Sequence, residues 1–452
     1  MISVPSAEAS AQRPTRVRYV IVLMLFVASC FSYGDRAMLS IIGDPLSKDL
    51  HLSSVQLGWL FSGFGWAYVL AQLPAGGLLD RYGSKRVYGA SIVGWSLCAL
   101  LAGFAGYLPA MAAFIAIFGL RLLSGLAQSP VFPGNGRIVA SWFPTAERGR
   151  SSAIFNSSQY FALVLFLPIF GWIAHRWGWK QCFWFAGVAG ILLSFVWDKV
   201  VHGVKTHPRI NQGEIDHIEQ GGGLTNIDPA AGSVVKAPKL TWSVVCMLLS
   251  NRMLVGIYIG QFCITTLTYF FITWFPVYLS RARHMSITTV GLMAAVPALC
   301  GSVGGILGGV FSDRLLKNGS SLTFARKTPI VLGMLLSVTM IGCNYVHAQW
   351  VVMVFMSLAF FGKGFGALGW TVIADTSPKP LIGLNGGLFN MFGNLAGITT
   401  PIAIGYILKW TGSFDGVLLF IAAMALLAIV AFLPIVGEIK RVDLPLPSES
   451  AA

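Results

Sequence analysis

The chain alternates between long apolar runs and short polar segments. Twelve runs of 19 to 28 residues contain very few charges. At a rise of about 1.5 Å per residue, roughly 20 apolar residues cross the ~30 Å hydrocarbon core of a bilayer as a helix. The pattern therefore predicts an all-α membrane protein with twelve transmembrane helices, at residues 19–42, 55–78, 87–106, 109–132, 150–173, 181–200, 252–279, 288–310, 328–346, 350–373, 384–408 and 413–436.

The longest polar stretch lies between the sixth and seventh runs and divides the chain into two halves. It covers residues 201–239, includes Glu214, Asp216 and Glu219, and has no apolar core of its own. Such a segment is typical of a linker, here with one short surface helix, rather than of a further domain. The predicted order is an N-terminal tail (1–18), a six-helix bundle (19–200), a cytoplasmic linker (201–248), a second six-helix bundle (249–437) and a C-terminal tail (438–452).

The composition supports the same class of protein. Of the 452 residues, 55% are hydrophobic and 11% are charged, and the mean hydropathy is +0.72, whereas a soluble chain carries roughly 25% charged residues. The net charge of +14 could suggest a nucleic-acid partner. With the N-terminus in the cytoplasm, however, most Lys and Arg fall on the cytoplasmic side, as the positive-inside rule requires. Both termini are therefore predicted to be cytoplasmic, and no nucleic-acid partner is expected.

The sequence lacks the groupings on which enzymes and ATP-driven pumps depend. Its seven Cys have no CxxC or Cys/His spacing, and its seven His lie in loops or at the ends of runs, so neither a metal nor a cofactor is expected. No Walker motif is present, which disfavours a pump. A membrane-bound ligand sensor is also disfavoured, because the linker and tails are too short for a signalling domain. Secondary transport is the leading interpretation.

The first apolar run contains an adjacent acid and base, Asp35 and Arg36. Each charge at this depth costs at least ~2.5 kcal/mol, so such residues usually mark a substrate or proton pathway. The alternative is a structural ion pair between helices. Neighbouring residues point about 100° apart around a helix, whereas Tyr33 and Arg36, three apart, share a face. Tyr33 and Arg36 are therefore interpreted as an anion site, and Asp35 as a proton site.

Two Asp-Arg pairs follow corresponding runs of the two halves, one after the second run and one after the eighth, so the halves repeat one another. The first pair stands in Gly-x-x-x-Asp-Arg-x-Gly-x-Lys-Arg, which resembles the signature of the major facilitator superfamily. In that family the motif is a cytoplasmic latch that holds the two halves together in one state. The resemblance assigns this role to Gly76, Asp80, Arg81, Gly83, Arg86, Asp313 and Arg314. The second copy is degraded, so the stronger latch is expected at Asp80.

Further motifs narrow the resemblance to the anion:cation symporter branch of that superfamily. They lie at residues 121–135, 141–149, 155–161, 269–276 and 386–394. Over nearly the whole chain the sequence is most similar to bacterial glucarate/galactarate symporters. The resemblance implies a monomer in the bacterial inner membrane that imports a sugar diacid with protons. An aldonate, hexuronate or other organic-anion symporter, and an anion exchanger, are the alternatives.

A sugar diacid needs cations for its two carboxylates and hydrogen-bonding groups for its hydroxyls. Arg36 can hold one carboxylate through two parallel hydrogen bonds. Lys363, too deep in its run to reach an interface, is the candidate for the other. Lys363 could instead be neutral or paired with Asp375, although twelve residues place that partner about 18 Å along a helix. With what the resemblance adds, the candidate substrate site is Tyr33, Arg36, Tyr68, Gln159, Lys363, Trp370, Asn390 and Asn394.

Several members of this site have an alternative structural role. Tyr68 could be a core aromatic residue, and the amides of Gln159 and Asn390 could bond one helix to another. Lys363 and Trp370 are seven residues apart, which is two helical turns, and are therefore expected on one face.

Arg121 and Gln128 are also seven residues apart and share a face of the fourth run. In the family the position of Gln128 is commonly a Glu that couples protons together with the acid of the first run. Because Gln cannot release a proton, either Asp35 couples alone or position 128 mimics the protonated state. The candidate coupling residues are Asp35, Arg121 and Gln128, with helix packing as the alternative role of Arg121.

Overall fold

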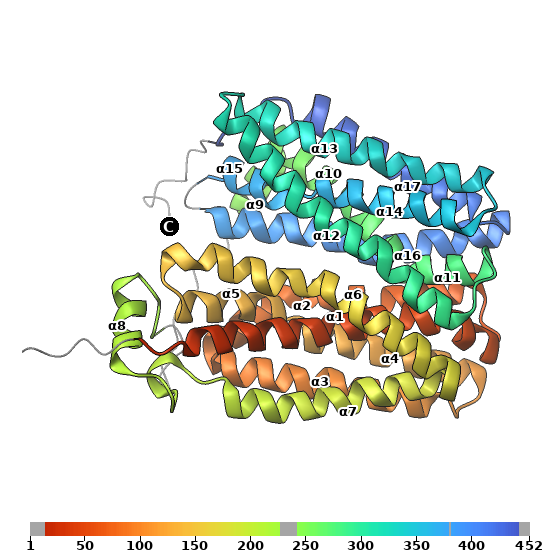
Figure 1. Ribbon diagram of the computed structural model, residues 1–452, viewed down its shortest axis with the longest axis horizontal. Helices are drawn as coiled ribbons and strands as arrows, with labels where there is room; N and C mark the ends of the chain where they lie inside the picture. Colours follow the sequence, from red (N-terminus) through yellow and green to blue (C-terminus); the bar gives the residue numbers. More distant parts are fainter. Residues whose placement is uncertain (1–13, 227–241, 379–380, 443–452) are drawn as a thin grey trace, which may run out of the picture.

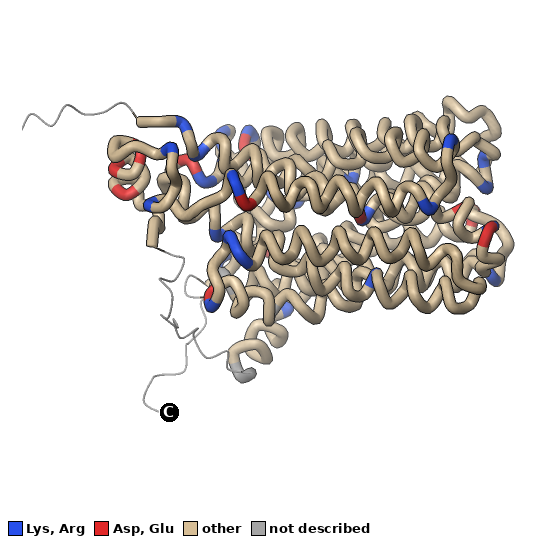
Figure 2. The backbone as a smooth tube through the Cα atoms, turned by 90° about the horizontal axis from the view of Figure 1, so that it is seen from below, with Lys and Arg blue, Asp and Glu red and all other residues tan. Residues whose placement is uncertain are grey.

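Two bundles of helices lie side by side in the structure, a computed structural model that describes residues 14–226, 242–378 and 381–442. In Figure 1 the N-terminal bundle is the lower one, red to yellow-green, and the C-terminal bundle is the upper one, green to blue. Helix α8 and the first turn of α1 lie at the left. The end of the molecule at which α1 begins and α2 ends is called the α8 end. The opposite end of the molecule is called the far end. Figure 2 shows charged residues gathered mostly towards the two ends.

The N-terminal bundle is built from long helices joined by very short turns. The capping box of Ser53 begins α2, and Gly83, with φ +81°, makes the turn into α3 in a backbone conformation that residues with a Cβ rarely adopt. Its helices are α1 (Val17–Asp49), α2 (Ser54–Tyr82), α3 (Ser84–Ala105), α4 (Ala110–Gln128), α5 (Val131–Trp142), α6 (Arg148–Trp177) and α7 (Trp179–Val200), and α8 (Gln212–Gln220) follows them.

The C-terminal bundle repeats this arrangement with more interruptions. A π-helical segment, Phe270–Trp274, lies inside its first long helix just before Pro276, which lacks the N–H needed to continue the α-helical pattern. Its helices are α9 (Trp242–Ser250), α10 (Arg252–Tyr269), α11 (Phe275–Arg281), α12 (Ile287–Lys317), α13 (Leu322–Val338), α14 (Gln349–Phe365), α15 (Gly369–Thr376), α16 (Ile382–Thr411) and α17 (Asp415–Val430).

Eleven helical segments among the described residues are long and apolar enough to cross a membrane. The other predicted span is α2, a 29-residue helix that packs against α4 of its own bundle and α16 of the other. The prediction of an all-α fold with twelve transmembrane helices in two six-helix halves is confirmed.

Some predicted boundaries are wrong. Helix α1 continues to Asp49 rather than ending at residue 42. The fourth run continues through α5, with a break at Ser129-Pro130. The tenth run is not one helix, because α14 ends at Phe365 and α15 begins at Gly369. This break lies in a glycine-rich stretch, where the entropic cost of fixing the backbone makes helix formation less favourable.

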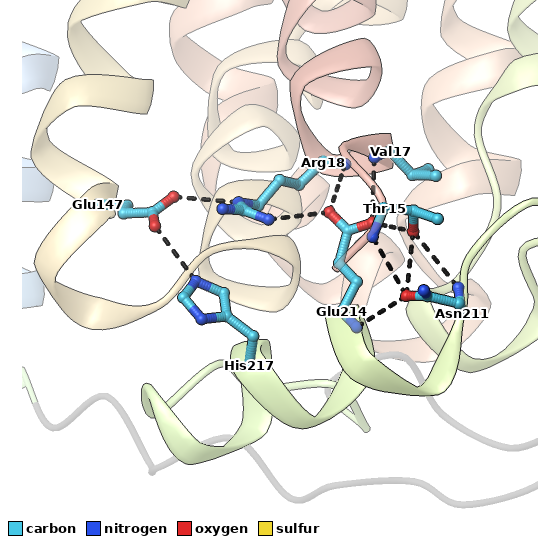
Figure 3. A network of polar contacts seen from close by, with 7 residues as sticks. All are labelled: Thr15, Val17, Arg18, Glu147, Asn211, Glu214 and His217. Carbon is cyan, nitrogen blue, oxygen red and sulfur yellow. Dashed lines mark hydrogen bonds and ion pairs between the residues drawn. The ribbon is translucent and has the colours of Figure 1, made fainter. Parts of the chain in front are cut away.

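A network of hydrogen bonds and ion pairs connects α8 to the N-terminal bundle (Figure 3). Glu214, which is completely buried, accepts hydrogen bonds from the backbone N–H groups of Val17 and Arg18, at 3.1 and 3.2 Å, and an ion pair from the Arg18 guanidinium at 3.0 Å. Arg18 also pairs with Glu147, which His217 of α8 contacts at 3.3 Å. A carboxylate thus satisfies the free N–H groups at the start of α1. Part of the predicted linker, including α8, is therefore packed on this bundle, while residues 227–241 lie outside the described residues.

Candidate functional site

A cavity of about 660 Å³ lies between the two bundles. One wall comes from α1, α2, α4, α5 and α6, and the other comes from α10, the π-helical segment, α12, α14, α15 and α16. All eight residues of the predicted substrate site line it: Tyr33, Arg36, Tyr68, Gln159, Lys363, Trp370, Asn390 and Asn394. Arg121 of the predicted coupling group lines it as well. The structure thus brings together residues that are more than 300 positions apart in the sequence.

Arg36 lies in an aromatic cage on the N-terminal side of the cavity. Its guanidinium carbon is 4.4 Å from the ring centre of Phe64, 4.6 Å from that of Tyr68 and 5.0 Å from that of Tyr33. Its Nε donates to the side-chain oxygen of Gln128 at 3.0 Å, and it makes no ion pair with a described residue. The rings hold the guanidinium by cation–π contacts, which leaves its charge available to an anion in the cavity.

Asp35 lies behind this cage, buried against α4. Its Oδ2 accepts hydrogen bonds from Gln128 Nε2 at 2.9 Å and from Ser124 at 3.3 Å, and it lies 3.5 Å from a terminal guanidinium nitrogen of Arg121. The Arg121 Nε has no partner among the described residues. Asp35 is therefore connected to α4 rather than to its sequence neighbour Arg36.

The side chain of Gln128 lies between the carboxylate of Asp35 and the guanidinium of Arg36. It is completely buried, its amide nitrogen donates to Asp35, and its oxygen accepts from Arg36 and, at 2.8 Å, from Ser32. Arg36 can only donate a hydrogen bond and an ionised carboxylate can only accept one, so the amide has one favourable orientation. A neutral bridge thus links the two charged groups without neutralising either.

Lys363 is the cation of the opposite wall. Its side chain is buried, with a residue exposure of 7%, and its Nζ lies 5.4 Å from the ring centre of Phe360. It forms no ion pair or hydrogen bond with a described residue. Asp375, the alternative partner, is 2.8 Å from Arg326. Trp370 lies beyond the break between α14 and α15, so the expectation of one continuous helical face is wrong, although both side chains line the cavity.

The predicted amides lie at different places on the cavity wall. Asn390 of α16 donates to Gln72 of α2 at 3.2 Å, a contact that joins the two bundles. The hydroxyl of Tyr269 donates to Asn394 at 3.2 Å. Gln159 of α6 donates to a backbone carbonyl of its own helix at 3.2 Å. Each amide thus has at least one protein partner and further hydrogen-bonding capacity.

Other polar residues of the cavity were not singled out from the sequence. Gln261, Thr265 and Tyr269 of α10 and Asn156 of α6 line it, and Gln72 bonds to Asn390. Their signal is the same as that of the predicted amides, namely a hydrogen-bonding side chain inside an apolar run.

The two bundles close against each other at the far end. Asp44 near the end of α1 pairs with Arg281 of α11 at 2.7 Å and accepts from Ser280 at 2.8 Å. Among ion pairs between described residues, this is the one that joins the bundles. A Cβ added at Gly58 of α2 would lie 2.5 Å from the carbonyl oxygen of Pro401 in α16, so the backbones touch there. The two bundles are therefore in direct contact at the far end.

The predicted latch residues lie at the α8 end, and their described ion pairs stay within one bundle. Asp80 pairs with Arg137 of α5, and Asp313 is 3.3 Å from Arg326 of α13. Arg81, Arg86 and Arg314 are exposed, and Gly76 and Gly83 lie in α2 and at its end. Among the described residues, the printed ion pairs of the predicted latch residues therefore connect helices of the same bundle.

Comparisons with known proteins agree with this architecture. The family model of the Major Facilitator Superfamily matches residues 25–318 and 257–450. The chain is 57% identical over 434 residues to the probable galactarate/D-glucarate transporter GudP of Bacillus subtilis, covering 96% of this chain and 95% of that protein. It is 54% identical to the protein of the same name from Escherichia coli, with coverage of 98% and 99%. The crystal structure of a D-xylose-proton symporter matches with a TM-score of 0.71 at 14% identity, covering 93% of this chain and 98% of that one.

Proposed function

This chain belongs to the major facilitator superfamily, and from that premise we propose that it imports a six-carbon sugar diacid of the glucarate/galactarate class together with protons, by alternating access. It is a multi-pass membrane transporter and not an enzyme. Relatives that are named as galactarate/D-glucarate transporters, and that align over nearly the whole chain, support the substrate class.

The charge of the cavity is the observation that carries the proposal. Three cations line it, Arg36, Arg121 and Lys363, and no Asp or Glu is among its described lining residues. With every side chain in its ordinary charge state at pH 7, and Asp35 behind Arg121 included, the group has a formal excess of two positive charges. Uncompensated charge is costly at this depth. A dianion would compensate more of this positive charge than a monoanion would.

The two carboxylates of such a substrate would join the two bundles. Arg36 belongs to α1 and Lys363 to α14, so a diacid held by both connects opposite walls of the cavity. A volume of about 660 Å³ lies within the ~300–1,000 Å³ range of small-molecule sites. Tyr33, Tyr68, Gln159 and Asn390 would serve the hydroxyls, and Trp370 the carbon chain. Substrate would thus favour the state in which the α8 end closes.

Proton coupling is assigned to Asp35. A proton on Asp35 would weaken its hold on Arg121 and on the Gln128 amide, which in turn positions Arg36. Substrate binding at Arg36 and protonation at Asp35 are therefore linked through Gln128. Arg121 orients the carboxylate, and Gln128, having no proton to release, leaves the titration to Asp35.

The distribution of Lys and Arg along the chain supports an orientation in the membrane. We place the α8 end in the cytoplasm and the far end in the periplasm, with the chain in the bacterial inner membrane. The structure then corresponds to the inward-facing state. In the outward-facing state the motif at Asp80 would engage the opposite bundle. The cavity is formed within one chain, so the transporter is proposed to act as a monomer.

Uptake by proteoliposomes tests the function. Vesicles containing the purified protein should accumulate labelled D-glucarate when the outside is acidic, and should exchange it for internal D-glucarate without a gradient. D-Gluconate has the same carbon chain with one carboxylate, and should compete at least about tenfold less well, which corresponds to ~1.4 kcal/mol for the lost charge pair. Absence of both uptake and exchange would overturn the proposal.

A further inference from the structure

We propose that Lys363 is a second proton carrier of the transport cycle. Its amine takes up a proton when a substrate carboxylate binds beside it, and it loses that proton after the substrate has left. The inference rests on the proposed function, because it needs a substrate with a carboxylate at the α14 wall. It assigns to Lys363 a role beyond substrate binding.

The surroundings of Lys363 hold no permanent counterion among the described residues. Its helix packs against α12, α13 and α10. The carboxylates of this region at the α8 end, Asp313 and Asp375, both pair with Arg326. The titratable groups that line the same cavity are cations and phenols, namely Arg36, Arg121, Tyr33, Tyr68, Tyr160 and Tyr269. The described contact of the Lys363 ammonium is a cation–π contact with the ring of Phe360 at 5.4 Å.

An ammonium in this position depends on the substrate. A buried lysine gives up its proton more readily than an arginine, which stays charged in proteins. In the empty cavity the ammonium would be buried opposite two arginines, with no anion beside it. A bound carboxylate supplies the anion and stabilises the charged form. Proton uptake and substrate binding at Lys363 are therefore linked, and each favours the other.

The cycle balances in protons and in charge. The proton comes from the solution on the side where substrate enters, resides on Nζ while the carboxylate is bound, and passes to the solution on the other side after release. With one proton on Asp35 and one on Lys363, a dianion enters with two protons and no net charge moves. The deprotonated amine also removes one buried positive charge from the empty carrier as it returns, and such a charge costs at least ~2.5 kcal/mol at this depth.

Proton uptake on binding tests the inference directly. Calorimetry of D-glucarate binding to the purified full-length protein, in buffers with different ionisation enthalpies, gives the number of protons taken up, from about pH 7 to about pH 9. Lys363→Arg keeps the charge but cannot release it. We expect this variant to bind D-glucarate and to take up about one proton fewer than the parent at the alkaline end of the range. Lys409→Arg, the same exchange at an exposed position of α16, should match the parent.

A second measurement needs no variant. In the parent, D-gluconate lacks the second carboxylate, so its binding should take up about one proton fewer than that of D-glucarate. Equal proton uptake with the two ligands, or an unchanged value in Lys363→Arg, would overturn the role of Lys363 while leaving diacid binding intact. A parent that binds neither ligand would instead overturn the proposed function itself.

Discussion

The ion pair at the far end should control how often the cavity opens to that side. Asp44 contacts Arg281 and Ser280 of the opposite bundle, and these contacts must break when the far end opens. Lys48 also pairs with Asp44, but it lies on the same helix and is mostly exposed, so its contribution changes little between the two states. Asp44→Asn should therefore destabilise the far-closed state selectively.

The burial of the pair sets the size of the effect. Exposed ion pairs contribute about 0–1 kcal/mol, whereas breaking a buried one costs about 3–5 kcal/mol. The side chain of Asp44 is 6% exposed and that of Arg281 is 28% exposed, which lies between these limits. We expect a shift of about 1–3 kcal/mol towards the far-open state, or about 5–150-fold in the equilibrium.

Labelling of a cysteine inside the cavity measures this shift. Ser40, one turn before Asp44 on α1, lines the cavity behind the seal. Ser40→Cys, in a background without the seven native cysteines, should react faster with an impermeant maleimide applied to the far side when Asp44→Asn is also present. Asp49→Asn is the matched control, because Asp49 accepts from Trp179 of its own bundle at 3.0 Å.

A double-mutant cycle identifies the partner. Arg281→Gln alone should also raise the labelling rate, and the double variant should add little to either single change, because both remove the same interaction. Labelling in Asp44→Asn at the rate of the Asp49→Asn control would refute the assignment of Asp44 and Arg281 as the far-end seal.

Four further variants test the substrate site, the predicted latch and the coupling group. Arg36→Ala should abolish D-glucarate binding in calorimetry. Lys363→Asn should weaken the binding of D-glucarate more than that of D-gluconate. Equal losses of affinity for the two ligands in Lys363→Asn would contradict the assignment of one cation to each carboxylate. Asp80→Asn should change the accessibility of cysteines on the two sides without changing the intrinsic site; unchanged accessibility on both sides would rule out the latch. Gln128→Glu should add a titrating group beside Arg36 and raise the number of protons per substrate in proteoliposome uptake at a clamped potential, and an unchanged ratio would contradict this role of position 128.

The sequence was sufficient for the architecture because each span is a long apolar run whose length matches the bilayer. Several residues that line the cavity could also be predicted from the sequence, because a hydrogen-bonding or charged side chain inside an apolar run must face a partner or a cavity. Arg36 and Lys363, from runs one and ten, both line the cavity for this reason.

The partner of each polar side chain could not be predicted in the same way. Whether the Arg36 guanidinium contacts Asp35 or Gln128 depends on how α1 and α4 are rotated relative to each other. The lengths of the apolar runs carry no information about this rotation. Asp44 lies just beyond the predicted end of the first span, where a charged residue carries no particular signal, yet the longer α1 and the approach of α11 bury it against Arg281. The break after α14 has a local signal in the sequence, the repeated glycines around Lys363.

The coupling of transport to protons through Asp35 is tested most directly by accumulation in proteoliposomes at a clamped membrane potential. Each proton coupled to one unit of pH gradient contributes ~1.4 kcal/mol, a factor of about ten in the accumulation ratio. Asp35→Asn keeps the shape of the side chain and removes its proton chemistry. It should retain counterflow of D-glucarate, while its accumulation ratio at a gradient of one pH unit falls about tenfold or more. Accumulation equal to that of the parent would show that Asp35 is not a coupling site and would contradict the mechanism.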